Sequence, residues 1–213
     1  MKIESTLIAS GIKQIAGVDE AGRGPCAGPL VVAAVILKDP FAPELSEVRD
    51  SKELSEALRE KLFDVVIEKA LSYSIIEISV EEIDSFGLHK SNLEGMRRAI
   101  NSLEVVPEYV LTDGYVIEGL AIPNLAVWKG DQVAVSISAA SILAKVYRDR
   151  ELVKLDAKYP GYGLAKHKGY ITAAQRVSRC SGTARQRRRS SARWRLRFLS
   201  VGQTSRSPTR PGS

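Results

Sequence analysis

The sequence predicts a mixed α/β fold, and two observations carry this prediction. Short apolar runs alternate with longer segments of helical periodicity, and two such runs near the N-terminus indicate antiparallel strands before helix-linked ones. The chain has 213 residues, of which 44% are hydrophobic, enough to bury one substantial core. We therefore expect one main domain over residues 1–175 and a compositionally different segment over 176–213.

Two strands are expected at 14–20 and 30–37, on either side of a glycine-containing loop. The second strand, LVVAAVIL, is a continuous apolar run rich in valine, which is typical of a strand buried on both faces. The short connection between the two runs favours a hairpin-like pair.

Helices and one further strand follow. Ser55 suits the N-cap of a helix that runs to about Leu71, because apolar residues then recur at three- and four-residue spacing. A strand is expected at 73–79. The letters SVEE at 79–82 fit a capping box that opens a short helix, and a second helix covers about 90–103.

The second half of the domain repeats the alternation. Strands are expected at 109–112 and 121–128, the first ending on DG and the second on KGD. A long helix should run from about Val133 to Lys158, where YPGYG breaks it. Antiparallel strands therefore come first, and strands joined by helices come after them.

The net charge of +6 arises at one end of the chain. Of the 31 lysines and arginines, eleven are arginines within 176–213, a segment without any acid, so twenty basic residues elsewhere face all 25 acidic ones. The body of the protein therefore carries a net charge of −5. An acidic body that handles a polyanion needs a cation at the point of contact, which directs attention to its carboxylates.

Several protein classes are disfavoured by the sequence. The longest apolar run, 30–37, is far shorter than the roughly 18 residues of a membrane helix, and MKIESTLIAS lacks a signal peptide's long apolar stretch. Cys26 and Cys180 are too few for a disulfide framework and are not spaced as a metal clip. We expect a soluble, cytoplasmic protein that is monomeric and makes no membrane contact.

Four carboxylates fall at the ends of expected elements, where α/β folds gather their ligands. They are Asp19, Glu20, Asp113 and Asp131. Such groups repel one another when brought together, and a divalent cation relieves that repulsion. Hard oxygen ligands suit Mg²⁺ or Mn²⁺. A single Asp-Gly is more often a cap or a loop residue, but the conjunction with the glycine loop favours a metal site.

Several motifs resemble those of bacterial ribonuclease HII, in order and at comparable spacing, over about residues 14–171. They are GVDEAGRGPCAGP, DSKEL, LTDG, KGD ahead of SAASILAKVYRDR, and YPGYGLAKHKGY. The resemblance implies a ribonuclease H-like fold with a mixed five-stranded sheet flanked by helices. It also implies hydrolysis of the RNA strand of RNA-DNA hybrids, including single ribonucleotides embedded in duplex DNA. Two-metal hydrolysis would leave 5′-phosphate and 3′-hydroxyl ends.

The resemblance also assigns residues by matching positions. The family's four catalytic, metal-binding carboxylates fall on Asp19, Glu20, Asp113 and Asp131. Its glycine-arginine-glycine reader of the ribonucleotide falls on Gly22, Arg23 and Gly24, and its junction-reading tyrosine falls on Tyr170. Backbone groups at the two glycines can approach a ribose closely, and the 2′-hydroxyl is the group that distinguishes RNA from DNA locally.

Other residues keep two interpretations. For Lys52 in DSKEL, the resemblance implies a contact with a substrate phosphate, whereas an isolated exposed lysine is usually only solvated. Lys166, His167 and Lys168 form a basic cluster that steers backbone phosphates, although His167 could instead assist proton transfer. Tyr170 could stack on a sugar or base, or pack against the core.

Two further alternatives concern the glycines and a fifth acid. Gly22, Gly24 and Gly28 are a weak match to a dinucleotide-binding loop, because their spacing is wrong and a strand follows them rather than a helix. Asp149 in YRDR is a candidate fifth metal ligand, but its position between two arginines favours an ion pair.

The chain departs from the family pattern after HKGY. Arginine, serine and glycine replace the expected segment, which suggests a reading-frame change or another unusual end, or else a disordered tail that binds nucleic acid. Two functions follow from this. The first is a metal-dependent endoribonuclease, and the alternative is a catalytically impaired nucleic-acid-binding protein that lacks the substrate-holding segment.

Overall fold

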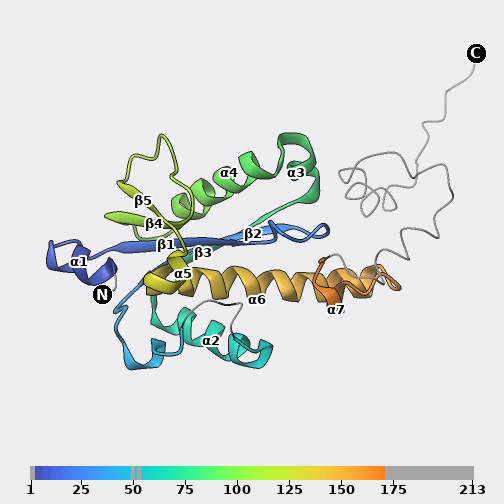
Figure 1. Ribbon diagram of the computed structural model, residues 1–213, viewed down its shortest axis with the longest axis horizontal. Helices are drawn as coiled ribbons and strands as arrows, with labels where there is room; N and C mark the ends of the chain where they lie inside the picture. Colours follow the sequence, from blue (N-terminus) through green and yellow to red (C-terminus); the bar gives the residue numbers. More distant parts are fainter. Residues whose placement is uncertain (1–2, 49–50, 52–53, 171–213) are drawn as a thin grey trace, which may run out of the picture.

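The computed structural model describes residues 3–48, 51 and 54–170. A five-stranded mixed sheet forms its centre (Figure 1). The strands are β1 (Ile15–Ala21), β2 (Leu30–Leu37), β3 (Ala70–Ile78), β4 (Tyr109–Asp113) and β5 (Asn124–Val127). Their order is β3-β2-β1-β4-β5, antiparallel from β3 to β1 and parallel from β1 to β5. The mixed α/β fold and the N-terminal hairpin are confirmed.

Helices cover both faces of this sheet. They are α1 (Ile3–Ala9), α2 (Glu56–Lys69), α3 (Val80–Phe86), α4 (Leu88–Asn101), α5 (Gly130–Val133), α6 (Val135–Lys158) and α7 (Leu164–His167), with a short 3-10 helix, η1 (Pro43–Leu45). In Figure 1, α3 and α4 lie on one side of the sheet, and α2 and α6 lie on the other. The fold is therefore a three-layer arrangement of helix, sheet and helix.

Strand β2 supplies the core of both layers, as its continuous apolar sequence predicts. Side chains alternate across a strand. Val31, Ala33 and Val35 pack toward α2 and α6, whereas their neighbours Val32 and Ala34 pack toward α4. Every residue of β2 is buried. A polar substitution anywhere along β2 would therefore place an unpaired group in one of the two cores.

Helix α6 reaches β1 because Gly17 has no side chain. A Cβ at this position would lie 2.0 Å from the carbonyl carbon of Ser136, closer than backbone and side chain can approach. The start of α6 is also capped by Glu4, whose Oε1 accepts hydrogen bonds from Ser136 N at 2.9 Å and Ser136 Oγ at 3.0 Å. These contacts fix the N-terminal end of α6 beside the strand that carries Asp19 and Glu20.

The two predicted serine caps are confirmed. Ser55 Oγ accepts from Leu58 N, and Ser79 Oγ accepts from Glu82 N, each at 3.2 Å. The reciprocal half of the capping box at 79–82 does not form, because the Glu82 carboxylate pairs with Arg98 on α4 at 2.7 Å. The tertiary ion pair between Glu82 and Arg98 thus replaces the local hydrogen bond that the capping box predicts.

Two predicted boundaries were wrong. The helix expected to reach Leu71 ends at Lys69, because Ala70 already pairs with Leu37 of β2. The strand expected at 121–128 is confined to Asn124–Val127. The long helix predicted from about Val133 to Lys158 is confirmed as α6 (Val135–Lys158), and Ala134, whose φ of −131° and ψ of 119° are extended, separates it from the short helix α5.

None of the helices in the described ranges is both long enough and apolar enough to cross a lipid bilayer.

Candidate active site

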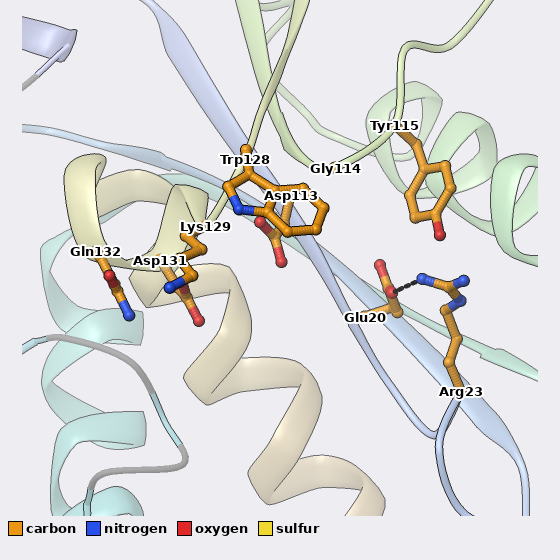
Figure 2. A pocket seen from close by; sticks show the side chains of 9 residues that line it. All are labelled: Glu20, Arg23, Asp113, Gly114, Tyr115, Trp128, Lys129, Asp131 and Gln132. Atoms are coloured by element: carbon orange, nitrogen blue, oxygen red, sulfur yellow. Dashed lines mark hydrogen bonds and ion pairs between the residues drawn. The ribbon is translucent and has the colours of Figure 1, made fainter.

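The sheet register brings the predicted carboxylates to one edge. Val18 of β1 pairs with Thr112 of β4. Because the two strands are parallel, the residues that follow, Asp19 on β1 and Asp113 on β4, are neighbours. Glu20 follows on β1, and Asp131 lies in the first turn of α5. Figure 2 shows the side chains of Glu20, Asp113 and Asp131 around a common pocket that all three line. The pairing of β1 with β4 is therefore what assembles the site.

Asp19 lies buried beside this pocket rather than lining it. Its Oδ1 accepts a hydrogen bond from Glu20 N at 2.7 Å. Burial, followed by repulsion from Glu20 and then from Asp113, raises the pKa of Asp19 well above its ordinary value. The fold thus places a carboxylate where an added positive charge would stabilise its ionised form.

Glu20 is held by the arginine of the glycine loop. Arg23 Nη1 lies 3.1 Å from Glu20 Oε1, an ion pair drawn in Figure 2, whereas Oε2 is buried without a hydrogen bond. Burial raises the pKa of Glu20, the pairing with Arg23 opposes that rise, and the Asp113 carboxylate adds to it. The net effect is a raised pKa, so the Arg23 guanidinium only partly compensates the negative charge of Glu20.

Asp113 connects the end of β4 to the start of α5. Its Oδ1 accepts a hydrogen bond from Gly130 N at 2.9 Å. The neighbouring Lys129, which precedes α5, has a positive φ of 53°, a conformation that non-glycine residues adopt rarely. This tight turn brings buried Asp131 to the same pocket as Asp113.

The donor set fits a hard divalent cation. It offers only carboxylate oxygens, one of them an orphaned buried atom, Glu20 Oε2. Burial and then repulsion from Glu20 and Asp113 raise the pKa of Asp19, and a bound cation would offset both effects. Across 3–48, 51 and 54–170, no group of three or more His, Cys, Asp or Glu side chains lies close enough together to hold a metal ion as the side chains stand. The carboxylates of the pocket have the chemistry of metal ligands, and they would have to move closer together to share an ion.

A buried arginine shapes the glycine loop. Arg148 on α6 is 1% exposed, and its guanidinium donates to the carbonyl oxygens of Pro29 at 2.9 Å, Ala27 at 2.8 Å and Lys168 at 3.0 Å. Gly22, at a φ of 118°, passes so close that a Cβ there would lie 2.6 Å from Arg148 Nε. Arg148 thus ties the loop and the segment before Tyr170 to one helix.

The predicted recognition residues come together around this arginine. A Cβ at Gly24 would lie 3.6 Å from Tyr170 Cε1, so the loop and the half-exposed tyrosine are in contact distance. Arg23 also lies over the ring of Tyr115, with Cζ 4.6 Å from the ring centroid. The loop therefore faces the carboxylate pocket on one side and Tyr170 on the other.

The residues of the predicted basic cluster, Lys166, His167 and Lys168, lie outside the pocket lining. Lys168 Nζ pairs with Glu56 on α2 at 3.3 Å, and Lys166 is exposed on α7. His167 uses both ring nitrogens within its own turn, accepting from Gly169 N at 3.1 Å through Nδ1 and contacting Tyr162 O at 2.7 Å through Nε2. This arrangement disfavours His167 as a proton carrier. Lys52 and the segment 171–213, including Cys180, lie outside the described residues.

Asp149 is an ion-pair partner and not a fifth ligand of the pocket. Its Oδ1 lies 2.7 Å from Lys145 Nζ, one helical turn earlier. The partner expected from the sequence was one of the flanking arginines, but Arg148 is engaged by backbone carbonyls and Arg150 pairs with Glu60.

Sequence reasoning missed three residues that shape the site. Tyr115 and Trp128 line the pocket, and Arg148 organises the loop. The aromatic residues stand next to the motifs LTDG and KGD, a position that could have drawn attention to them. Arg148 gives no such signal, because its acceptors are backbone carbonyls that no sequence pattern marks.

Known proteins resemble this chain over most of its length. The profile of the family described as ribonuclease HII matches residues 16–199. The match extends past the predicted boundary at residue 175, and the division into 1–175 and 176–213 stays a prediction. The solved structure of ribonuclease H2 from Pyrococcus horikoshii has a TM-score of 0.70 and 30% identity, covering 87% of this chain and 98% of that one.

Two relatives show the closeness in sequence. Ribonuclease HII of Nocardia farcinica is 51% identical over 202 residues, which are 92% of this chain and 80% of that protein. Ribonuclease HII of Salinispora arenicola is 53% identical over 171 residues, 80% of this chain, but the chain spans only 64% of that relative's length. The extent of the family match and these identities show that the chain belongs to the ribonuclease HII family.

Proposed function

We propose that the chain is a metal-dependent endoribonuclease that hydrolyses the RNA strand of RNA-DNA hybrids and cuts at single ribonucleotides embedded in duplex DNA. One observation carries the proposal: the loop that would read the ribose and the pocket that would cut the backbone share the ion pair between Arg23 and Glu20. Membership of the ribonuclease HII family supports the reaction class. Recognition and cleavage are then held in one register.

The residues that would hold Mg²⁺ or Mn²⁺ are Asp19, Glu20, Asp113 and Asp131. Such ions would supply a water of lowered pKa and positive charge beside the leaving 3′-oxygen, and hydrolysis would leave 5′-phosphate and 3′-hydroxyl ends. Asp113 would keep its position because Gly130 N binds its Oδ1, and the same contact fixes the turn that carries Asp131. The protein's contribution is therefore a rigid set of ligands presented from two paired strands and one helix.

Selection of a ribonucleotide would rest on the glycine loop. Gly22 and Gly24 leave the backbone accessible to a 2′-hydroxyl, which is both a donor and an acceptor. Arg23, while paired with Glu20, would also contact a substrate phosphate, and Tyr170, beside Gly24, would contact the sugar at the junction. Arg148 supports this selection indirectly, because it holds both segments in place.

The basic residues would act at longer range. We propose that Lys52, Lys166 and Lys168 contact backbone phosphates of the duplex, positioning it without reading sequence. We do not propose the non-catalytic alternative, because all four carboxylates are retained at one edge of the sheet. Monomeric state and cytoplasmic location remain predictions, the first of which light scattering on the purified protein would test.

A substrate panel tests the proposed function. Purified protein is incubated with three labelled duplexes: one carrying a single ribonucleotide, one RNA-DNA hybrid and one of DNA alone, each in Mg²⁺, Mn²⁺ or EDTA. We expect cleavage of the first two in either metal, with 3′-hydroxyl ends, and none in EDTA or on DNA alone. Cleavage in EDTA, or equal cleavage of the DNA duplex, would contradict the proposal.

A further inference from the structure

Trp128 is the most exposed large apolar side chain at the carboxylate pocket. It is 83% exposed although it lines the same pocket as Glu20, Asp113 and Asp131. Tryptophan side chains are mostly buried in proteins. An exposed tryptophan beside a polar site therefore indicates a role in binding rather than in the core. Figure 2 shows it among the residues that line the pocket, next to Lys129.

The backbone on both sides of Trp128 is anchored to Asp113. Val127, immediately before it, pairs with Asp113 in the β4–β5 ladder, and Val127 O accepts a hydrogen bond from Gly114 N at 3.0 Å. Gly130, two residues after it, donates to Asp113 Oδ1 at 2.9 Å. The position of Trp128 is therefore fixed relative to a carboxylate of the proposed metal site, while its ring is left to solvent.

The chemistry around the ring favours a nucleic-acid backbone as its partner. Lys129 follows directly, lines the same pocket and supplies a positive charge suited to a phosphate. A flat apolar ring beside a cation matches the alternation of sugars and phosphates along one strand. In a duplex the base faces are stacked on one another, so an indole that lies along the backbone beside a phosphate meets the apolar face of a sugar.

We propose that Trp128 is a substrate-binding residue that packs against a sugar of the strand whose phosphate enters the carboxylate pocket. The inference rests on the proposed function and adds to it a contact on the side of the pocket formed by β5 and α5. The contact is blind to base sequence and to the 2′-hydroxyl, because the latter is read at the glycine loop. Trp128 would therefore strengthen binding of any duplex in the register that cleavage requires.

Intrinsic fluorescence measures this contact directly. The chain has two tryptophans, and the other, Trp194, lies outside the described residues. A Trp194→Phe variant leaves Trp128 as the only indole. Titration of this variant, with Asp113→Asn added to prevent cleavage, with ribonucleotide-containing duplex and with all-DNA duplex, both in Mg²⁺, should change its emission saturably and to a similar extent. An unchanged emission at duplex concentrations that saturate binding by polarisation would overturn the proposal.

Substitutions separate contact from stability. Trp128→Ala should raise the Kd for both duplexes and the KM for cleavage about tenfold, the scale of one aromatic contact to nucleic acid, while kcat stays within about twofold. Trp128→Tyr should restore most of the affinity. Phe86→Ala, at a residue 64% exposed on α3 and outside the pocket, is the matched control and should leave Kd unchanged.

The outcomes distinguish the failure of this inference from failure of the proposed function. If Trp128→Ala binds and cleaves as the wild type does, the inference is wrong and the proposed function stands. If the emission changes with duplex but the wild type cuts no duplex in Mg²⁺, the contact stands and the proposed function is wrong. A larger change with single-stranded DNA than with duplex would show base stacking and would overturn packing on a sugar.

Discussion

Arg23 Nη1 lies 3.1 Å from Glu20 Oε1, so a residue of the proposed ribose-reading loop is paired with a proposed metal ligand. This pairing lowers the pKa of Glu20 against the effect of burial, which raises it. The loop and the metal site are consequently coupled through one charge. A change in the loop should therefore be visible in the pH dependence of cleavage as well as in substrate choice.

Arg23→Ala should shift the acidic limb of the pH–rate profile to higher pH. Without the guanidinium, the pKa of Glu20 rises further, so a higher pH is needed to ionise it and hold a cation. We also expect kcat/KM on a single-ribonucleotide duplex to fall about tenfold, the scale of one charge-assisted hydrogen bond. Pre-steady-state cleavage from pH 5.5 to 9 measures both. An unshifted limb would show that the ion pair does not tune Glu20.

Asp19→Asn should stabilise the metal-free protein at neutral pH. Because the folded-state pKa of Asp19 is raised above its ordinary value of 3.8, the wild type loses stability as the pH rises through the window above 3.8. Asparagine has no charge to lose, so the advantage of the variant is greatest at pH 7 and vanishes near pH 4. Thermal melts in EDTA test this, with the exposed Asp64→Asn on α2 as control. A variant that melts below the wild type at pH 7 would contradict the prediction.

Arg148→Met should cost about 3 kcal/mol of unfolding free energy, because three buried carbonyl oxygens lose their donor. Arg150→Ala, which breaks an exposed pair with Glu60, should cost no more than about 1 kcal/mol. Urea unfolding measures both. Arg148→Lys, which keeps the charge but not the three-way donation, should still reduce the preference for ribonucleotide over DNA duplex. Retention of full preference in the lysine variant would show that the loop is held by other contacts.

Removal of 176–213 should flatten the salt dependence of duplex binding. Eleven arginines without an acid bind any duplex through counterion release, a contribution that falls steeply with salt. The ribonucleotide preference and the Mg²⁺ requirement should survive, since we place them at Gly22–Gly24 and the four carboxylates. Circular dichroism melts establish that the truncated protein folds. Loss of the preference in a folded truncation would show that the segment belongs to the recognition surface and that the boundary at 175 is misplaced.

Local and strongly periodic features could be predicted from the sequence. The pattern of β2 determines which residues face each layer, and Ser55 and Ser79 cap helices through hydrogen bonds to residues three positions later. Predicted boundaries were wrong where pairing with a distant strand competes with the helix. Ala70 was predicted to be helical, but it pairs with Leu37 of β2 and belongs to β3. Such competition involves residues far apart in the chain and leaves no local signal.

The positions of the carboxylates at element ends could likewise be predicted, but their convergence could not. It depends on the pairing of β1 with β4 and on the approach of α6 to Gly17, both set by tertiary packing. The roles of Arg148 and Trp128 were also hidden. Arg148 donates to backbone carbonyl oxygens, which every residue has, and Trp128 is distinguished only by its exposure in the structure.

The most direct test of the central claim compares single-turnover cleavage of a single-ribonucleotide duplex in Mg²⁺ by five variants. Asp19→Asn, Glu20→Gln, Asp113→Asn and Asp131→Asn each remove one proposed ligand, whereas Asp149→Asn removes a neighbouring acid that pairs with Lys145 outside the pocket. We predict that each of the first four loses at least about 100-fold in rate while remaining folded, and that Asp149→Asn stays within about threefold of the wild type. Near-native cleavage by any of the four, or an equal loss in Asp149→Asn, would contradict the assignment of these carboxylates as the metal-binding, catalytic set.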